Sequence, residues 1–386
     1  MRILYVISGL GLGGAEKQLV GLARQMAERG HDVAIYTLNS DVSRKATLDG
    51  SSVSLIVDQK RARLDFAVLK RLRATIARWQ PDIVHGFLFD GDLYSRLAAL
   101  GTGLPVLNSE RNDDYRLSWP QSLAHRLTRR LARGVVANTH SGKAFAQRRY
   151  VLPGERVHVV WNGICLDELA QQAAAPTIDV RADFFGDPRV RVACLVGSIK
   201  PGKDYHLALE SAAELLAADP KWRVLFIGDR LAAPGTGVPG RSSDTSAYKS
   251  EILEHYRRVG LPQQIKFAGL RTDVPALVRQ CDVLFVTSLH EGFPNVVLEG
   301  MGLGVPVVST EYSDIRRILP LPAQVVPGRS PADIARAIVW AHSERHVIAS
   351  RQKDWVLANA TMEKSALALE QVYRQYLKAS PLPQPA

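Results

Sequence analysis

Two glutamates, Glu291 and Glu299, carry the strongest chemical signal in the chain because they flank a predicted helix start. An apolar run at residues 281–288 precedes them and is typical of a buried parallel strand. Pro294 suits the first turn of a helix, where its missing N–H costs nothing. We therefore expect Glu291 in a loop at the carboxyl end of the strand and Glu299 about one turn into the helix that follows.

Backbone N–H groups at such a helix start can hold a phosphate, and the two carboxylates can accept hydrogen bonds from hydroxyls on either side of it. A sugar nucleotide has this layout, with sugar hydroxyls, a diphosphate and ribose hydroxyls in succession. Two solvated acids of an ordinary βαβ unit are the alternative, so the neighbouring residues decide the interpretation.

The segment HEGFPNVVLEGMGLGVPVVST, residues 290–310, resembles the E-x7-E signature of retaining glycosyltransferases with the GT-B fold, of the family 4 (group 1) type. The spacing, the GFPN insert and the following strand all match. The resemblance implies that Glu291 holds the sugar hydroxyls, that Glu299 holds the ribose and that backbone N–H groups hold the diphosphate. The loop residues that it assigns to donor binding are Gly292, Phe293, Pro294 and Asn295.

A second segment, residues 196–204, looks like the G-R-x-x-x-x-K-G motif of the same family. Lys203 matches the lysine that neutralises the donor diphosphate as leaving-group charge develops. Ser198 stands where the family has arginine, and Asp204 replaces the glycine. Lys200 and Arg230 are the candidates for supplying the missing charge. The resemblance completes the donor-binding set with Ser198, with Gly228 at a strand end and with Leu270 in a loop that reads the nucleobase.

Residues 9–14, GLGLGG, follow the first predicted strand and fit G-x-G-x-x-G, so a dinucleotide-binding site is one interpretation. That interpretation requires an acid at the end of the second strand, whereas here Asn39 ends the strand and Asp41 comes late. In the resemblance, Gly13 and Gly14 instead form an acceptor-side loop that lets the backbone approach the donor phosphate.

Residues 82–87 resemble the family motif D-V-V-H-x-H, with Phe87 in place of the second histidine. The contact of that histidine with the donor is therefore lost, moved to Asp90 or Asp92, or taken by His85. The predicted catalytic residues are Glu291, His85 and Lys203.

Strand-like runs alternate with helical patterns along the chain, which predicts parallel α/β sheets. The resemblance implies two Rossmann-like domains that face each other across a cleft. The predicted strands are residues 3–8, 32–38, 53–57, 83–85, 106–109, 135–137, 157–161, 191–196, 222–227, 265–267, 283–286, 307–309 and 324–326. The predicted divisions are an acceptor-binding domain at 1–177, a nucleotide-sugar-binding domain at 178–358, a helix at 359–377 that crosses back to the first domain, and a disordered tail at 378–386.

The net charge of +11 is concentrated in the first half, where residues 1–177 hold 24 Lys and Arg against 16 Asp and Glu. Two predicted helices, at residues 60–78 and 121–133, combine an apolar stripe with a basic face. Such helices can lie against an anionic membrane, and the alternative is an ordinary surface helix with a solvated basic face. The predicted membrane or acceptor residues are Arg126, Arg129, Arg130 and Arg133.

The resemblance implies a metal-independent enzyme without a cofactor, so none is expected. It would transfer a hexosyl or N-acetylhexosaminyl group to a lipid-linked or polysaccharide acceptor, such as a lipopolysaccharide precursor. Isolated cysteines, a start that lacks a cleavage site and the lack of a membrane-length apolar run predict a cytoplasmic protein, peripheral at the inner face of the membrane. Nucleic acid is not expected as a partner, since no basic platform carries interleaved aromatics.

Two other functions stay open at this stage. A sugar-nucleotide epimerase or hydrolase shares the fold but needs a stronger acid–base set than the motifs contain. A non-catalytic sugar-nucleotide-binding protein fits the departures from the family pattern at Ser198, Phe87 and Arg317, where the family often has a glutamate.

Overall fold

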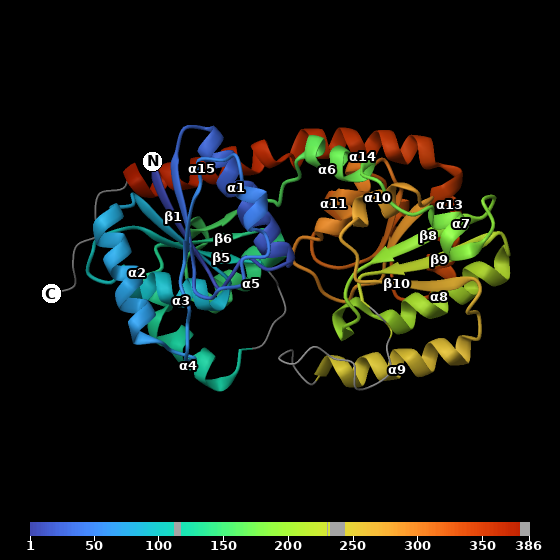
Figure 1. Cartoon of the computed structure of the whole chain (residues 1–386), viewed down its shortest axis with the longest axis horizontal. Coiled ribbons are helices and arrows are strands. Elements are labelled where there is room, and N and C mark those ends of the chain that lie inside the picture. The colour runs from blue at the N-terminus through green and yellow to red at the C-terminus, as the bar shows by residue number, and fades with distance from the viewer. Residues whose placement is uncertain (112–116, 230, 232–243, 379–386) are drawn as a thin grey trace. The chain divides into compact units, whose positions relative to one another are not determined.

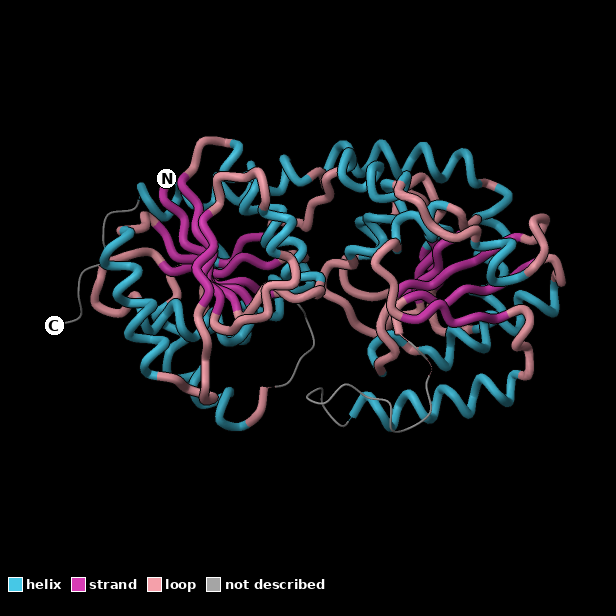
Figure 2. The backbone as a smooth tube through the Cα atoms, viewed as in Figure 1, coloured by secondary structure: helices cyan, strands magenta, loops and turns pink. Residues whose placement is uncertain are grey.

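The computed structural model describes residues 1–111, 117–229, 231 and 244–378. The chain divides into two compact units, Met1–Gly163 with Ala360–Ala386, and Ile164–Asn359. Each unit is built around its own parallel sheet, and helices cover both faces of that sheet (Figure 1, Figure 2). The α/β architecture predicted from the alternating patterns is therefore confirmed.

The sheet of the first unit has seven parallel strands in the order β3-β2-β1-β4-β5-β6-β7. Its inner strands are buried on both faces, which explains their continuous apolar sequences. The strands agree with the predicted ranges to within two residues at either end, and are β1 (Arg2–Ile7), β2 (Asp32–Thr37), β3 (Ser54–Val57), β4 (Ile83–Phe87), β5 (Val106–Glu110), β6 (Gly134–Ala137) and β7 (Val157–Val159).

Two groups of helices sandwich this sheet. On one face α1 (Gly14–Glu28) contacts α15 (Met362–Lys378), the last helix among the described residues. On the other face α3 (Leu88–Ala98) lies between α2 (Phe66–Trp79) and α4 (Trp119–Thr128) and contacts both (Figure 1). A further helix, α5 (His140–Tyr150), packs on β6 and β7.

The two basic helices of the first unit are oriented differently. In α2 the predicted apolar stripe is buried, with Val68 and Leu72 fully inaccessible to solvent. In α4 the predicted stripe faces outward, with Leu123 43% and Leu127 74% exposed. The same sequence pattern therefore gives a core-facing stripe in one helix and a solvent-facing stripe in the other.

Glu370 attaches α15 to the first unit. Its carboxylate accepts hydrogen bonds from Arg29 Nε at 2.8 Å and from Arg374 Nε at 3.0 Å. Burial alone would raise the pKa of the Glu370 carboxyl, but the bonds from Arg374 and Arg29 outweigh it and lower this pKa to about 2. The ionised form is thus strongly favoured in the folded protein.

We expect Glu370→Ala to lower the free energy of unfolding by about 1.5–3 kcal/mol at pH 7, as for a charge-assisted hydrogen bond. Because the folded pKa is depressed, the wild type holds this stability above the ordinary carboxyl pKa and loses it as the pH falls toward 2. Thermal unfolding of both proteins from pH 7 to pH 2.5 measures the difference. A constant difference in melting temperature across that range would contradict the ionic role.

The sheet of the second unit has six parallel strands in the order β10-β9-β8-β11-β12-β13. The predicted strand ranges again agree to within two residues, and the observed strands are β8 (Arg191–Val196), β9 (Trp222–Ile227), β10 (Ile265–Gly269), β11 (Val283–Val286), β12 (Val307–Thr310) and β13 (Val325–Val326). Its helices are α6 (Leu166–Ala174), α7 (Val180–Phe185), α8 (Tyr205–Ala218), α9 (Asp244–Val259), α10 (Val274–Arg279), α11 (Asn295–Gly302), α12 (Ile315–Ile318), α13 (Pro331–Ser343) and α14 (Arg345–Asn359).

The first unit ends at Gly163, earlier than the expected division at residue 177. The reason is that α6 packs on α10 and α11 and so belongs to the second unit. The helix expected at 359–377 is α15, which belongs to the first unit. Of the tail expected at 378–386, Lys378 ends α15 and the rest lies outside the described residues.

Each sheet has one point where the strand order reverses direction, next to its first strand. In the second unit this point lies between β8 and β11, which are neighbours in the sheet. Ligands of open α/β sheets bind outside the carboxyl ends of the strands at such points. The loops after β8 and β11 are therefore where the fold favours a ligand.

Candidate active site

The loops that follow β8 and β11 are joined by hydrogen bonds. Leu289 N–H donates to the carbonyl oxygen of Gly202 at 2.9 Å, and the Thr287 hydroxyl donates to that of Lys203 at 2.8 Å. The two predicted donor motifs, far apart in the sequence, thus form one edge of the second unit.

The carboxylate of Glu291 forms an ion pair with the ammonium group of Lys203. The Ser288 hydroxyl donates to the same carboxylate at 3.0 Å. The side chains of Lys203 and Glu291 are 13% and 18% exposed, so they are screened by protein but still reachable from solvent. Two of the three predicted catalytic residues are therefore in contact.

Local backbone geometry places the Lys203 side chain. A 3₁₀ turn, η4 (Pro201–Lys203), reverses the chain, and Asp204 continues it at φ +45°. The aliphatic part of Lys203 lies over Gly197, where any Cβ would crowd it. The left-handed conformation explains why a glycine suits the Asp204 position, and aspartate is one of the residues that tolerates it. The Asp204 carboxylate also caps α8 by accepting from Leu207 N–H at 3.2 Å.

Arg329 is a residue of this edge that the sequence analysis did not find. Its guanidinium donates to the carbonyl oxygens of Thr287 at 2.6 Å and Ser288 at 3.3 Å, and to the Asp204 carboxylate at 2.5 Å. It therefore holds the loops after β8 and β11 together. The signal available in the sequence was its place just after the last predicted strand, at the same edge of the sheet.

The loop after Glu291 leads into α11. Gly292, Phe293 and Pro294 are buried, and Pro294 is the N-cap residue of α11, one position before the first helical turn in which it was predicted. Because the N-cap residue is a proline, its side chain makes no capping hydrogen bond to the helix start. Glu299 is half-buried in the second turn of α11. Asn295, the first helical residue, is also half-buried.

Two further predicted donor residues lie at the same edge of the sheet. Gly228 directly follows β9 at φ +145°, and a Cβ there would clash with the carbonyl oxygen of Gly197. This close approach requires glycine. Leu270 follows β10 and is 70% exposed, an unusual exposure for a leucine. Both residues come from the loops that follow neighbouring strands.

The family arginine has no equivalent among the described residues of the turn after β8. Ser198 and Lys200 are exposed there. The second candidate for the missing charge, Arg230, lies outside the described residues. The backbone N–H of Ile199, which lies between Ser198 and Lys200, donates to the Asp229 carboxylate at 2.8 Å and so fixes this turn.

His85 does not fit the catalytic role predicted for it. The ring is fully buried, and its two nitrogens form hydrogen bonds with the hydroxyls of Tyr373 at 2.6 Å and Ser109 at 2.9 Å. Burial and then the charge of Arg111 lower the pKa of His85 well below its ordinary value. The neutral imidazole thus connects β4 to α15 and has no nitrogen available for a substrate.

The two aspartates considered as substitutes are also engaged with protein groups. Asp90 forms an ion pair with Lys60. Asp92 is buried and accepts a hydrogen bond from the Tyr150 hydroxyl at 3.0 Å. Burial raises the pKa of Asp92 to about 7, although the charge of Arg96 and the bond from Tyr150 act to lower it.

The glycine loop of the first unit surrounds the start of α1. Gly13 is the N-cap residue of α1, and Gly14 is its first residue. The Glu16 carboxylate lies against Gly13, at the point where a Cβ would project. Gly11 is likewise approached by the carboxylate of Asp41. The loop therefore packs against acidic side chains of its own unit.

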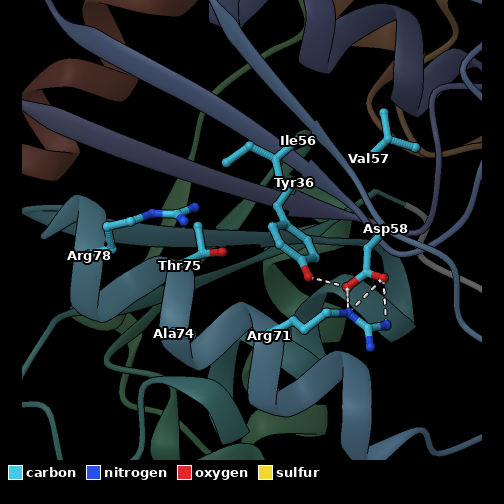
Figure 3. Close-up of a pocket in the computed structure, with 8 residues that line it drawn as sticks. All are labelled: Tyr36, Ile56, Val57, Asp58, Arg71, Ala74, Thr75 and Arg78. Atoms are coloured by element: carbon cyan, nitrogen blue, oxygen red, sulfur yellow. Dashed lines mark hydrogen bonds and ion pairs between the residues drawn. The ribbon is translucent and has the colours of Figure 1, made fainter.

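A surface pocket of about 290 Å³ lies elsewhere in the first unit, between the edge strand β3 and helix α2 (Figure 3). Inside it, Asp58 accepts hydrogen bonds from the Tyr36 hydroxyl and from Arg71 Nη2 at 2.6 Å. Burial would raise the pKa of Asp58, but the bonds from Arg71 and Tyr36 lower it. The pocket is not at the switch point of its sheet, and these three polar groups satisfy one another.

Two absences apply to the part of the chain that the structure describes. Within it, no three His, Cys, Asp or Glu side chains are grouped as ligands for a metal ion. Over the same residues, none of the helices is long and apolar enough to cross a membrane.

Comparisons with known proteins agree with the geometry. The model of Glycosyltransferase Family 4 matches residues 12–168, and that of Glycosyl transferases group 1 matches residues 190–344. D-inositol 3-phosphate glycosyltransferase 2 of Catenulispora acidiphila is 24% identical over 87% of this chain and 83% of that protein. The lipopolysaccharide core biosynthesis mannosyltransferase LpsB of Rhizobium meliloti is 26% identical, over 50% of this chain and 54% of its own length.

The fold of the chain is also that of a solved structure. The crystal structure of Anabaena Alr3699/HepE in complex with UDP has a TM-score of 0.79 and 19% identity, and the match covers 97% of this chain and 100% of that one. The two family models fall one on each unit, and the donor-side motifs meet on one sheet edge. The chain belongs to the group 1, family 4 glycosyltransferases of the GT-B fold.

Proposed function

We propose that this protein is a retaining glycosyltransferase that takes a hexosyl or N-acetylhexosaminyl group from a nucleoside-diphosphate sugar held by the second unit. The observation that carries the proposal is the contact between Lys203 and Glu291 at the switch point of the sheet, beside the start of α11. One cation, one carboxylate and one helix start there match the diphosphate and hydroxyl groups of such a donor.

In the proposed complex each chemical group of the donor is held by its own set of protein groups. Lys203 and the N–H groups near Phe293 and Asn295 hold the diphosphate, and Glu291 accepts hydrogen bonds from the sugar hydroxyls. Glu299 accepts hydrogen bonds from the ribose, and exposed Leu270 lies against the nucleobase. The ion pair of Lys203 with Glu291 orients both side chains before the donor arrives, which reduces the cost of organising them.

The proposed reaction is a front-face displacement. The bond between the anomeric carbon and the diphosphate oxygen breaks, and the acceptor oxygen forms its bond on the same face of the sugar. The acceptor proton passes to the departing diphosphate, so no protein nucleophile is required. Lys203 stabilises the charge that develops on the leaving group, and the remaining residues act by positioning.

The proposed acceptor is a lipid-linked or polysaccharide glycan, and the first unit receives it. Support comes from the surplus of basic residues in that half of the chain and from the relative named as a lipopolysaccharide core mannosyltransferase. Catalysis would take place on the cytoplasmic side of an anionic membrane, with the protein as a peripheral component of cell-surface glycan synthesis.

The experiment that tests the proposal combines a binding screen with an acceptor requirement. Thermal shift with UDP-, GDP- and ADP-sugars identifies the donor, and release of the nucleoside diphosphate is then followed with and without lipid-linked glycan. Release that requires the acceptor supports a transferase. Release without an acceptor would show a hydrolase, conversion of the donor sugar an epimerase, and binding alone a non-catalytic protein.

We expect Glu299→Ala to weaken donor binding by about tenfold to a hundredfold, since a charge-assisted bond to the ribose contributes about 1.5–3 kcal/mol. Because the substitution also truncates a half-buried helix residue, the melting temperature without ligand is measured as the control for folding. Calorimetric titration with the donor found in the screen measures the effect. The assignment would fail if the melting temperature fell and the folded fraction bound the donor normally.

Transfer is expected to continue when divalent metal is removed, because Lys203 and the start of α11 supply the positive charge that a metal would otherwise provide. Turnover is measured in EDTA, and again after magnesium is added in excess. A loss of activity in EDTA that magnesium restores would contradict the metal-independent reaction.

A further inference from the structure

Helix α4 presents an apolar stripe to solvent. Trp119 is 77% exposed, Leu123 43% and Leu127 74%. The three residues are spaced four apart in the helix and therefore lie along one face. Together they form an exposed aromatic and aliphatic row, which we call the α4 stripe.

The polar side of α4 is the one that packs on the protein. His125 is buried, its Nε2 lies 3.3 Å from the carbonyl oxygen of Arg149, and its ring makes an edge contact with Tyr150 at 4.7 Å. Ser118 and Gln121 form a capping box at the start of the helix. The contacts of His125 with α5 fix the rotation of the helix about its axis, so the α4 stripe is held outward by the fold.

The charges beside the stripe have one sign. Residues 117–133 contain no aspartate or glutamate. Arg126 and Arg130 are exposed, whereas Arg129 and Arg133 donate to the carbonyl oxygens of Arg149 and Gly103, each at 3.1 Å. Of the four arginines predicted to face a membrane, the structure thus leaves two with outward guanidinium groups.

The start of helix α2 carries a second group of exposed apolar and basic residues. Leu64 is 43% exposed and Phe66, the first residue of α2, is 71% exposed, and Arg63 and Lys70 nearby are exposed as well. Both α2 and α4 contact α3, and both follow strands of one parallel sheet (Figure 1). The two helices therefore begin at the same edge of the sheet and on the same face of it.

We propose that the α4 stripe inserts into the headgroup region of an anionic bilayer, with the start of α2 as a second contact. Tryptophan favours the interface between headgroups and acyl chains, leucine the acyl boundary, and arginine the anionic phosphates. The choice of a lipid-linked acceptor rests on the proposed function, whereas the membrane contact itself rests only on the exposed residues. The occupant to which we commit is the membrane.

The charge pattern disfavours a second copy of this chain as the occupant. In a twofold dimer the same patch meets itself, so the α4 stripes would pair with each other. Arg126 and Arg130 of one copy would then face the same arginines of the other, with no acid in residues 117–133 to neutralise them. An anionic bilayer satisfies both the stripe and the arginines.

The first test measures binding of the full chain to vesicles by flotation, without donor or acceptor. Vesicles of phosphatidylcholine with about 30 mol % phosphatidylglycerol are compared with phosphatidylcholine alone at low salt. The double variant Leu123→Gln, Leu127→Gln is expected to bind the anionic vesicles about tenfold or more weakly than the wild type. Its matched control, Val347→Gln with Leu357→Gln, changes two comparably exposed residues of α14, 51% and 45%, and should bind normally.

The second test addresses the arginines. Arg126→Glu with Arg130→Glu is expected to reduce vesicle binding by more than about tenfold, since each basic residue near the surface contributes about fivefold. The control Arg351→Glu with Lys353→Glu makes the same charge change on exposed residues of the second unit. Raising the salt concentration should weaken binding of the wild type to the vesicles, because salt screens the attraction between the arginines and the anionic lipids. Each variant should keep the melting temperature of the wild type.

The third test locates Trp119. Brominated lipids should quench part of the tryptophan fluorescence of the wild type, and Trp119→Phe should remove that quenched part. The proposal is overturned if the wild type ignores anionic vesicles at low salt or if the leucine variant binds them as well as the wild type does. A wild-type dimer that the leucine variant converts to monomer would assign the stripe to a second copy instead. Because no sugar donor is present, none of these outcomes depends on the transferase reaction.

Discussion

Glu291→Gln is expected to lower sugar transfer by about two to three orders of magnitude, the effect of removing one preorganised polar group from a reacting centre. Glutamine keeps the shape of the side chain and can still accept the bond from Ser288, but it lacks the charge that pairs with Lys203. The binding of nucleoside diphosphate should persist, because Lys203 and the start of α11, which are proposed to hold the phosphates, are unchanged. Turnover and titration with UDP, or with the nucleotide found by the screen, measure the two quantities.

The control is Glu344→Gln, an exposed glutamate of the second unit that should change neither quantity. If nucleoside diphosphate affinity falls as far as turnover in Glu291→Gln, the side chain holds the phosphates or the loop and not the sugar. If neither changes, the predicted role of Glu291 is wrong.

Lys203→Met should weaken binding of the nucleoside diphosphate by about ten to a hundredfold and leave that of the bare nucleoside unchanged. A charge-assisted hydrogen bond to phosphate contributes about 1.5–3 kcal/mol, and only the diphosphate carries that charge. Methionine retains the packing of the aliphatic stem over Gly197, so the loop should keep its fold. Calorimetric titration of both ligands gives the two affinities.

Lys353→Met, which removes an exposed lysine of α14, serves as the reference for a general effect of net charge. Equal weakening of diphosphate and nucleoside would place Lys203 away from the phosphates. The variant Lys200→Met tests whether exposed Lys200 supplies the positive charge that an arginine supplies in other members of the family, where this chain has Ser198.

The strands, the fold class and the donor-side edge follow from local sequence. Strands buried on both faces need continuous apolar residues. Runs of apolar residues such as those of β8 and β11 therefore predict where the strands lie. Parallel strands also place the residues after their carboxyl ends at one edge. The family resemblance assigned Lys203 and Glu291 to one donor site. In the structure the Thr287 hydroxyl joins the two loops by donating to the carbonyl oxygens of Lys203 and Asp204.

The roles of buried polar residues required the tertiary structure. His85 matched a family motif, but the Tyr373 hydroxyl of α15 forms a hydrogen bond with one of its ring nitrogens. Arg329 holds the two donor-side loops through backbone carbonyls, which have no sequence signature. In both cases the partner is distant in sequence, so no local pattern records the contact.

The orientation of α4 is the clearest difference between pattern and structure. The stripe of α2, with Val68 and Leu72, is buried, whereas the stripe of α4, with Leu123 and Leu127, is exposed. Periodicity shows that a helix has an apolar side but does not say what covers that side. The contacts of His125 with α5 fix which side of α4 packs inward, and those contacts exist only in the folded unit.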